Sequence, residues 1–221
     1  MSLADPRLIA RQYQETRERL VDILSNPDTD WDVRVPACPE WCVRDVVAHL
    51  TAVAEDWFDG TLTGPPSADQ TAAQIARFSG HDHTGIVSAW TTASERLDRM
   101  AEVTGVAPPL GDVACHEHDV RGALGRSGAR DSDAVWSASH QLLTNLQTPR
   151  PLRVIVEGDE YRTGPAGGAE IRLRTTRFEA LRWRTGRRSR AQLRAMDWSD
   201  DPSPVLDHLY LFGPADVDVV E

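Results

Sequence analysis

Apolar residues recur at the spacing of an amphipathic helix through the first two thirds of this chain, and this period limits the fold more than any other feature. The first such segment begins at Asp5-Pro6, a good helix start, and stops at Asn26-Pro27. Further helices are predicted at about 43–59, 84–103, 110–124 and 131–147, with a weaker one at about 68–78. Because the connections between them are short, they favour an antiparallel helical bundle.

The pattern changes near residues 148–151, where Thr-Pro-Arg-Pro interrupts the helical period. The segments 152–158 and 170–175 flank a glycine-rich turn and are alternating or rich in β-branched residues, which predicts a hairpin or two short strands. Helical spacing returns over 176–186, and residues 190–196 are interpreted as a further strand.

Two domains follow from this change of pattern. The 221 residues suffice for one large domain or for one domain with a smaller appendage. We therefore predict a mainly α fold, with a helical bundle at 1–148 followed by a small α+β domain at 149–221.

Charge and composition exclude several classes of protein. The formal net charge of −10 argues against a nucleic-acid-binding surface. No apolar run is long enough to predict a transmembrane helix, and the opening MSLADPRLIARQYQ does not resemble a secretory signal, so a cytoplasmic location is expected. The three cysteines, Cys38, Cys42 and Cys115, are an odd number at spacings that predict neither a disulfide framework nor a structural zinc knuckle.

One pair of residues has the spacing of metal ligands. Asp112 and His116 lie four residues apart in a predicted helix, so their side chains share one helical face. His49, about two turns inside another predicted helix, is a candidate third ligand, because helical bundles build metal sites from facing helices. Three protein ligands suit a catalytic ion with open positions, and this set is compatible with zinc, nickel, cobalt or manganese.

The pattern also has a plainer explanation. An aspartate four residues before a histidine is common by chance, and a lone helical histidine is more often a surface residue or a satisfied core residue. The remaining histidines are poorer candidates: His118 points away from the His116 face, and His81 and His83 lie in a loop-like segment. His140 and His208 have no partner at metal spacing.

Two motifs resemble a known family. The segment VPACPEWCVRDVVAHL at 35–50 resembles the N-terminal signature of the DinB-like, mycothiol-dependent maleylpyruvate isomerase family. The segment HEHDVRGALG at 116–125 resembles a later helix of that family, and TTRFEALRWRTGRRSRAQLRAMDW at 175–198 is similar to its C-terminal region.

The resemblance implies a DinB-like four-helix bundle that binds a divalent metal, for which zinc is the first choice. It places His49, Asp112 and His116 on the metal-ligand positions, and for some members it implies a low-molecular-weight thiol cofactor, here mycothiol. The chain departs from the family at Asp112, where Glu is often found, and at Cys42, where Ser or Thr is usual.

Other residues near these motifs received separate interpretations. Cys42 is interpreted as a helix N-cap with Asp45 in the capping-box position, although Asp45 could instead orient His49. Trp41 is expected to pack over the start of its helix. Asp119 and Arg121 are candidates for contacts with the metal ligands or with substrate, but an exposed pair at a helix end is the favoured interpretation.

Arginines concentrate between residues 172 and 194, in a chain that is acidic as a whole. Arg182, Arg187 and Arg188 are candidate contacts for an anion or a thiol cofactor, because guanidinium groups match carboxylates. A solvated face with salt bridges is the favoured explanation for most of this cluster.

Two functions remain open from the sequence. The first is a metal- and thiol-dependent transferase or isomerase that acts on a small acidic or electrophilic substrate. The second is a non-catalytic metal- or small-ligand-binding protein on the same fold. Either would act on small molecules as a monomer or homodimer, without nucleic acid or membrane.

Overall fold

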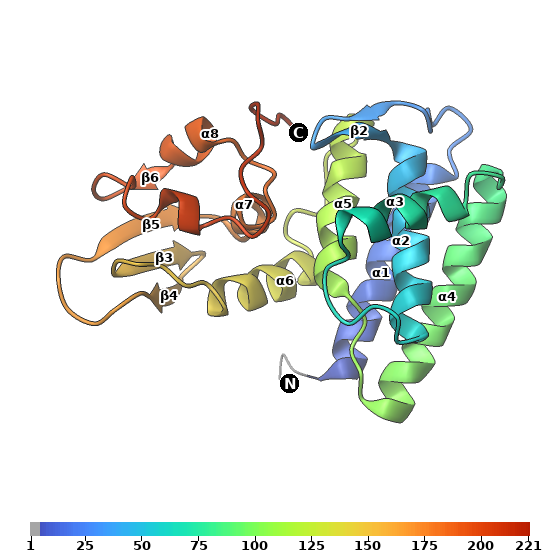
Figure 1. Cartoon of the computed structure of the whole chain (residues 1–221), viewed down its shortest axis with the longest axis horizontal. Coiled ribbons are helices and arrows are strands. Elements are labelled where there is room, and N and C mark those ends of the chain that lie inside the picture. Colours follow the sequence, from blue (N-terminus) through green and yellow to red (C-terminus); the bar gives the residue numbers. More distant parts are fainter. Residues whose placement is uncertain (1–4) are drawn as a thin grey trace. The chain divides into compact units, whose positions relative to one another are not determined.

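A computed structural model describes residues 5–221 of the protein, so the first four residues of the predicted N-terminal domain lie outside the described part. The chain divides into two compact units, residues 1–128 with Glu221, and residues 129–220. Figure 1 shows the N-terminal unit as long helices and the C-terminal unit as a small sheet with shorter helices. The fold is therefore mainly helical with a small sheet, as the sequence predicts.

The N-terminal unit contains most of the predicted helices. Their bounds are α1 Pro6–Leu24, α2 Val43–Phe58, α3 Ala68–Arg77, α4 His83–Thr104 and α5 Leu110–Ala123. Helix α1 begins where predicted, since the Asp5 side chain accepts a hydrogen bond from the Arg7 N–H and Pro6 needs no acceptor. Helix α4 ends at Thr104, and the next residue, Gly105, has a φ of 72°, the left-handed conformation that glycine adopts without strain.

The long helices α1, α2, α4 and α5 pack against one another in pairs, and α3 packs on α2 (Figure 1). Helix α2 contributes Val46, Val47 and Leu50 to the core, all nearly inaccessible to solvent. Burying an aliphatic side chain of this size stabilises a fold by roughly 1.5–3 kcal/mol. Two aromatic side chains of this core are joined by a hydrogen bond, in which Trp90 Nε1 donates to the Tyr13 hydroxyl at 3.1 Å.

Between α1 and α2 the chain forms two short antiparallel strands, β1 Arg34–Val35 and β2 Cys38–Cys42. Cys42 is the N-cap of α2, and its backbone N–H donates to Asp45 Oδ2 at 2.9 Å. The predicted capping role of Asp45 is therefore confirmed.

The C-terminal unit combines helices with one sheet. Its elements are α6 Asp133–Thr144, β3 Leu152–Val156, β4 Asp159–Thr163, β5 Ile171–Thr175, α7 Arg177–Arg184, α8 Arg190–Arg194, β6 Asp197–Trp198 and a short 3₁₀ helix, Leu206–His208. The strand order is β4-β3-β5-β6, in which β3 and β5 are parallel and the other pairs are antiparallel.

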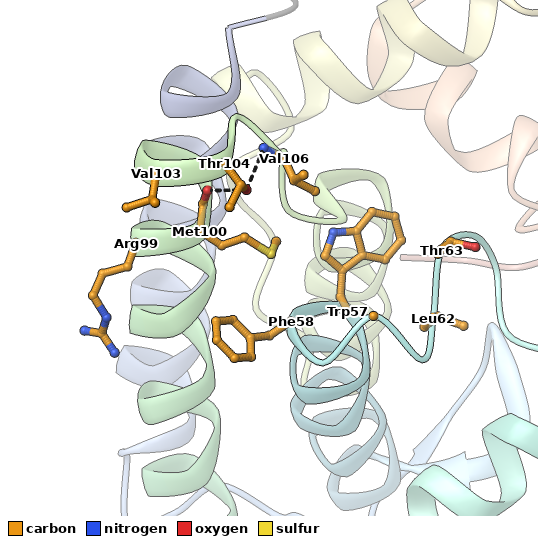
Figure 2. Close-up of a pocket in the computed structure, with 10 residues that line it drawn as sticks. Trp57, Phe58, Leu62, Thr63, Arg99, Met100, Val103, Thr104 and Val106 are labelled. Atoms are coloured by element: carbon orange, nitrogen blue, oxygen red, sulfur yellow. Dashed lines mark hydrogen bonds between the residues drawn. The ribbon is translucent and has the colours of Figure 1, made fainter.

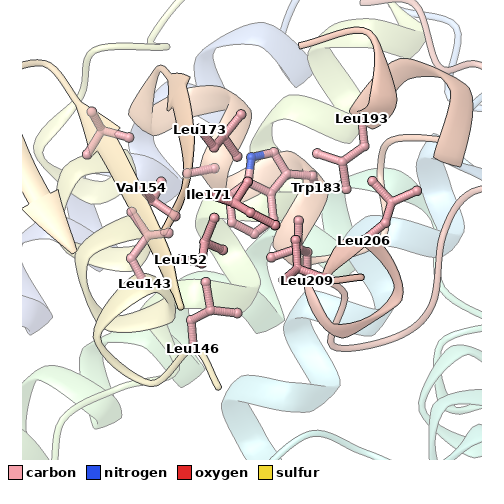
Figure 3. Close-up of a cluster of buried hydrophobic side chains, with 13 residues drawn as sticks. Leu143, Leu146, Leu152, Val154, Ile171, Leu173, Trp183, Leu193, Leu206 and Leu209 are labelled. Carbon is pink, nitrogen blue, oxygen red and sulfur yellow. The ribbon is translucent and has the colours of Figure 1, made fainter. Parts of the chain in front are cut away.

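A cluster of buried hydrophobic side chains forms the core of this unit (Figure 3). Alternate residues of β3 and β5, including Leu152, Val154 and Leu173, face Trp183 of α7. The alternation follows from the two-residue period of a strand, which places every second side chain on the same face of the sheet.

Two local predictions in this unit need correction. Residues 190–196 were predicted as a strand, but 190–194 form α8, because Ser189 and Gln192 make a reciprocal capping box at its start. Of the two alternatives predicted for 152–158 and 170–175, two short strands are confirmed as β3 and β5, and the hairpin is wrong, since β3 first pairs with β4 across a tight turn. In that turn Glu157 and Gly158 both have positive φ, as a two-residue hairpin turn requires.

The first compact unit ends at residue 128, apart from Glu221, whereas the change of sequence pattern predicts a domain limit at 148. The difference is α6, which packs against α7 and so falls within the second compact unit. This division is one of compactness alone, and the limits 1–148 and 149–221 stay a prediction. No helix among residues 5–221 is long and apolar enough to cross a membrane.

Candidate metal centre

His49 lies in the middle of α2 and is almost completely buried. Its Nδ1 nitrogen is 3.0 Å from Oε1 of Gln74, a buried residue of α3. Its Nε2 nitrogen points the other way and lies 3.6 Å from Oδ1 of Asp112. One side of the ring is therefore held by α3, while the other side faces α5.

Asp112 and His116 stand on one face of α5, as their four-residue spacing predicts. Nε2 of His116 is 3.6 Å from the same oxygen of Asp112 that His49 approaches. The two imidazole rings meet edge to face, with centroids 5.2 Å apart. The structure thus brings all three predicted ligands together from two helices that are distant in sequence.

The far side of the His116 ring faces Asp119. Nδ1 of His116 lies 2.8 Å from Oδ2 of Asp119, and this carboxylate is inaccessible to solvent. The thiol of Cys38 on β2 donates to the same carboxylate at 3.8 Å. A carboxylate so close to Nδ1 favours a proton on that nitrogen, which directs the ring's other nitrogen toward Asp112.

Trp41 of β2 lies against both histidines. Its ring centroid is 5.2 Å from that of His49 and 5.9 Å from that of His116. The structure therefore places Trp41 at the candidate centre itself as well as at the start of α2. An indole in this position adds apolar surface beside the ring nitrogens and limits the access of water to them.

Buried ion pairs fix the helix that carries two of the three residues. Glu117, beside His116 on α5, is inaccessible to solvent and pairs with Arg19 of α1 at 2.7 Å and with Arg121 at 3.0 Å. The two oxygens of Glu117 thus receive guanidinium groups from two helices, which holds the rotation of α5 relative to α1.

The arrangement of donor atoms fits a divalent ion. Oδ1 of Asp112 is 3.6 Å from each Nε2, too far for a hydrogen bond, and the candidate donor atoms of the three residues all lie within 4.8 Å of one another. Ligands bound tetrahedrally to zinc at 2.0–2.1 Å are separated by about 3.4 Å. The observed spacing is therefore close to that of a coordination sphere.

Among the described residues, a second group also meets the distance criterion for metal ligands: Cys38, His116 and Asp119. It shares His116 with the first group, on the Nδ1 side of the ring. The 2.8 Å approach of Asp119 to that nitrogen is a hydrogen-bonding distance rather than the wider separation of two ligands on one ion. We therefore interpret this second group as the support for the His116 ring.

Known proteins resemble this chain in sequence and in fold. Residues 13–114 match the family model described as "Mycothiol maleylpyruvate isomerase N-terminal domain". This part of the chain belongs to that domain family. The resemblance predicted from the sequence motifs is therefore confirmed. The matched part of the mycothiol maleylpyruvate isomerase N-terminal domain includes His49 and Asp112 and ends two residues before His116.

Solved structures extend the likeness beyond this domain. A crystal structure of the mycothiol-dependent maleylpyruvate isomerase shares 16% sequence identity with the chain and superposes with a TM-score of 0.55. A structure of a histidine-to-alanine mutant of the mycothiol-dependent maleylpyruvate isomerase gives 15% identity and a TM-score of 0.52. In both cases the match covers 85% of this chain and 90% of the other, so the fold is shared over most of both chains. A search of curated proteins gives no match.

The three arginines predicted to contact an anion all lie in or after α7, in the C-terminal unit. Arg182 is completely buried, and Arg188 is buried and paired with Glu179 at 2.7 Å. Arg187 is half-buried and donates to the Thr185 carbonyl at 2.7 Å. Their role toward an anion stays a prediction.

A cavity of about 690 Å³ lies at the C-terminal ends of α2 and α4. Figure 2 shows the side chains that line it. Its lining is mainly apolar and includes Trp57, Phe58 and Met100. His49 precedes Trp57 by eight residues, or about 12 Å along the helix axis, and none of the three candidate ligands lines this cavity.

The residues that support the two histidines differ from those expected from the sequence. Asp119 was interpreted as half of an exposed pair with Arg121, which is wrong, since Asp119 is buried against His116 and Arg121 binds Glu117. The spacing of three residues between His116 and Asp119 was the available signal. Gln74 was not identified at all, because its contact with His49 joins two helices and leaves no local pattern.

Proposed function

We propose that His49, Asp112 and His116 bind one divalent transition-metal ion. One observation carries this proposal: two imidazole nitrogens converge on one carboxylate oxygen at equal distances of 3.6 Å, outside hydrogen-bond range. Three atoms that all carry lone pairs repel one another at this range unless a proton or a cation lies between them. Zinc is the first choice for such a ligand set, and nickel, cobalt and manganese are alternatives.

We further propose that the long helices α1, α2, α4 and α5 form a DinB-like antiparallel four-helix bundle around this centre. Their pairwise packing and the family of residues 13–114 support this assignment. In such a bundle the ligands come from facing helices, which leaves the remaining coordination positions for small molecules.

We infer that the protein is a metal- and thiol-dependent isomerase or transferase that acts on a small acidic or electrophilic substrate. The family description and the titles of the two similar structures support mycothiol as the thiol and an isomerisation as the reaction. A bound divalent ion lowers the pKa of a thiol or polarises a substrate carbonyl, which is the chemistry that a thiol-assisted isomerisation needs.

The residues around the candidate centre would orient the two histidine rings, exclude water from them and leave a route by which a small molecule reaches the metal. Gln74 and Asp119 hold the Nδ1 sides of the two rings and so direct both Nε2 atoms to one point. The histidine side chains are 4% and 6% exposed but that of Asp112 is 27% exposed, which indicates that a small molecule reaches the centre from the Asp112 side. Of the three predicted arginines, Arg187 is the most accessible and remains our candidate for an anion contact.

A second candidate is a non-catalytic metal- or small-ligand-binding protein on the same fold. The position of the cavity favours it, because the 690 Å³ space between α2 and α4 is separate from the three candidate ligands. A fold and a metal site together do not determine a reaction.

The test is elemental analysis of the purified wild type beside His116→Ala, with His208→Ala as the control because His208 is exposed in the other unit. We expect about one equivalent of a transition metal in the wild type and the control, and its loss in His116→Ala. Absence of metal from all three proteins after reconstitution would remove the proposed centre.

The metal-loaded protein would then be assayed with mycothiol and maleylpyruvate, and with other small electrophiles. Turnover that needs both the thiol and His116 supports the enzyme. A protein that binds metal stoichiometrically but shows no thiol-dependent turnover with any electrophile supports the non-catalytic alternative.

A further inference from the structure

A line of polar contacts connects His49 to the outer surface of α3. Oε1 of Gln74 is 3.0 Å from Nδ1 of His49, and Nε2 of Gln74 donates to Oδ2 of Asp56 at 2.8 Å. The other oxygen of Asp56 accepts from Arg77 at 2.8 Å. Gln74 is 1% exposed, so its amide is a buried polar group whose partners decide its orientation.

The chemistry of these partners fixes the direction of each hydrogen bond. An ionised carboxylate only accepts hydrogen bonds, so Asp56 must face the NH₂ group of the Gln74 amide. The carbonyl oxygen of that amide then faces His49 and can only accept. Nδ1 of His49 must therefore carry the proton, which leaves the lone pair of the neutral ring on Nε2, toward Asp112.

We propose that Gln74 and Asp56 are positioning residues that set the tautomer of His49 for metal binding. The proposal rests on the metal-binding role proposed above for His49. With the opposite tautomer, a proton on Nε2 would occupy the direction in which the ring must offer its lone pair. The tautomer of His49 is thus set by the Asp56 carboxylate, which does not contact the ring itself but acts through the Gln74 amide.

Arg77 makes this arrangement specific. Its guanidinium pairs with Glu55 through one nitrogen and with Asp56 through another, each at 2.8 Å. The ion pair holds Asp56 in the position from which it receives the Gln74 amide. Glu55 shares the same arginine and the same helix, so it provides a matched control for the charge of Asp56.

The first experiment compares the zinc affinity of the wild type, Asp56→Asn and Glu55→Gln by competition with a fluorescent chelator. An asparagine at 56 offers both a donor and an acceptor, so the Gln74 amide can turn over and present its NH₂ group to His49. Loss of such supporting contacts weakens metal binding by about 10–100-fold, which we expect for Asp56→Asn, with less than a twofold change for Glu55→Gln.

The second experiment exchanges the amide and the carboxylate between positions 56 and 74, so that residue 74 again accepts a hydrogen bond from His49. In the double variant Asp56→Asn with Gln74→Glu, the asparagine donates to a glutamate that can only accept from Nδ1. The net charge is unchanged, and the zinc affinity should return to within a few-fold of the wild type. A double variant weaker than Asp56→Asn alone, or a Glu55→Gln variant as weak as Asp56→Asn, would overturn the proposal.

The third readout needs no metal. Two-bond ¹H–¹⁵N correlation spectra of the metal-free protein distinguish the two tautomers of the His49 ring, and we expect the Nδ1–H form in the wild type and the double variant. The Nε2–H form should increase in Asp56→Asn. If the wild type binds no metal but the tautomers follow this pattern, the proposed function fails and the positioning role stands. If zinc binds but the Asp56→Asn tautomer is unchanged, the positioning role fails alone.

Discussion

One carboxylate oxygen, Oδ1 of Asp112, is the atom on which the candidate centre converges. Its side chain is one methylene shorter than the glutamate often found there in the family, and it still reaches both ring nitrogens at the same distance. The Nδ1 atom of each histidine ring contacts a polar side chain, Gln74 for His49 and Asp119 for His116, and these contacts set the orientation of the two rings. The candidate ligand atoms thus belong to three residues, whereas the orientation of the two rings depends on their neighbours.

Cys42 shows how one residue's surroundings change its chemistry. Burial raises the pKa of its thiol, and the Asp45 carboxylate, 3.2 Å from Sγ, raises it further. The thiolate is the reactive form, so the alkylation rate of Cys42 should rise with pH around a midpoint above that of a free cysteine. Asp45→Asn removes a negative charge and should move this midpoint to lower pH.

The measurement is iodoacetamide labelling between pH 7 and pH 10.5, resolved by fragment-ion mass spectrometry because Cys38 lies on the same tryptic peptide. The readout is the pH midpoint rather than the absolute rate, since burial alone slows access. A midpoint at or below that of N-acetylcysteine would contradict this account of the Cys42 environment.

Helix α3 is short, but it orients one of the three candidate ligands. It is a ten-residue helix that packs on α2, yet it carries the amide that holds His49. Isolated helices of this length are marginal in water, so α3 depends on its cap and on its packing. Ser67 provides the cap, because its side chain accepts from the Gln70 N–H while Gln70 accepts from the Ser67 N–H.

Ser67→Ala should therefore loosen α3. Removal of an N-cap side chain costs about 1 kcal/mol, which corresponds to roughly fivefold faster local opening. Hydrogen exchange followed by mass spectrometry should show this acceleration in the amides of α3, with those of α4 unchanged. Ser67→Asp, which keeps an acceptor at the cap, is the control and should exchange like the wild type. Unchanged exchange in α3 of Ser67→Ala would show that packing on α2 alone maintains the helix.

For the whole molecule, the relevant feature is that each compact unit has a hydrophobic core of its own. The three candidate ligands all belong to the N-terminal unit, and the arginines predicted to contact an anion belong to the C-terminal unit. A metal ion that binds only folded protein stabilises the unit that holds it.

Zinc at one hundred times its Kd should therefore raise the free energy of unfolding of the N-terminal unit by about 2.7 kcal/mol. Hydrogen exchange of the slowest amides in α2 and α5, compared with those in β3 and β5, measures both units in one sample. We expect the gain in the first set only, and no gain in His116→Ala. An equal gain in both sets would show that the two units unfold together.

Local features of the sequence were sufficient for most of the helices and for the ligand pair on α5. Helix α1 is bounded by Asp5-Pro6 and by the residues before Pro27, and the Asp112–His116 spacing specifies one face of one helix. These features depend on residues within a few positions of one another, where capping, backbone restriction and helical period act directly. The strand predicted at 190–196 is wrong for an equally local reason, because the Ser189–Gln192 capping box starts a helix there.

The partners that complete the candidate centre were decided only by the tertiary structure. The contacts of Gln74 with His49 and of Asp56 with Gln74 join α2 to α3. In the sheet, β3 pairs in parallel with β5, although β4 lies between them in the sequence. Asp119 became a partner of His116 only because α5 is buried on that side. Such contacts depend on which faces of different elements meet, and this is set by the packing of the whole core rather than by the period of any one segment.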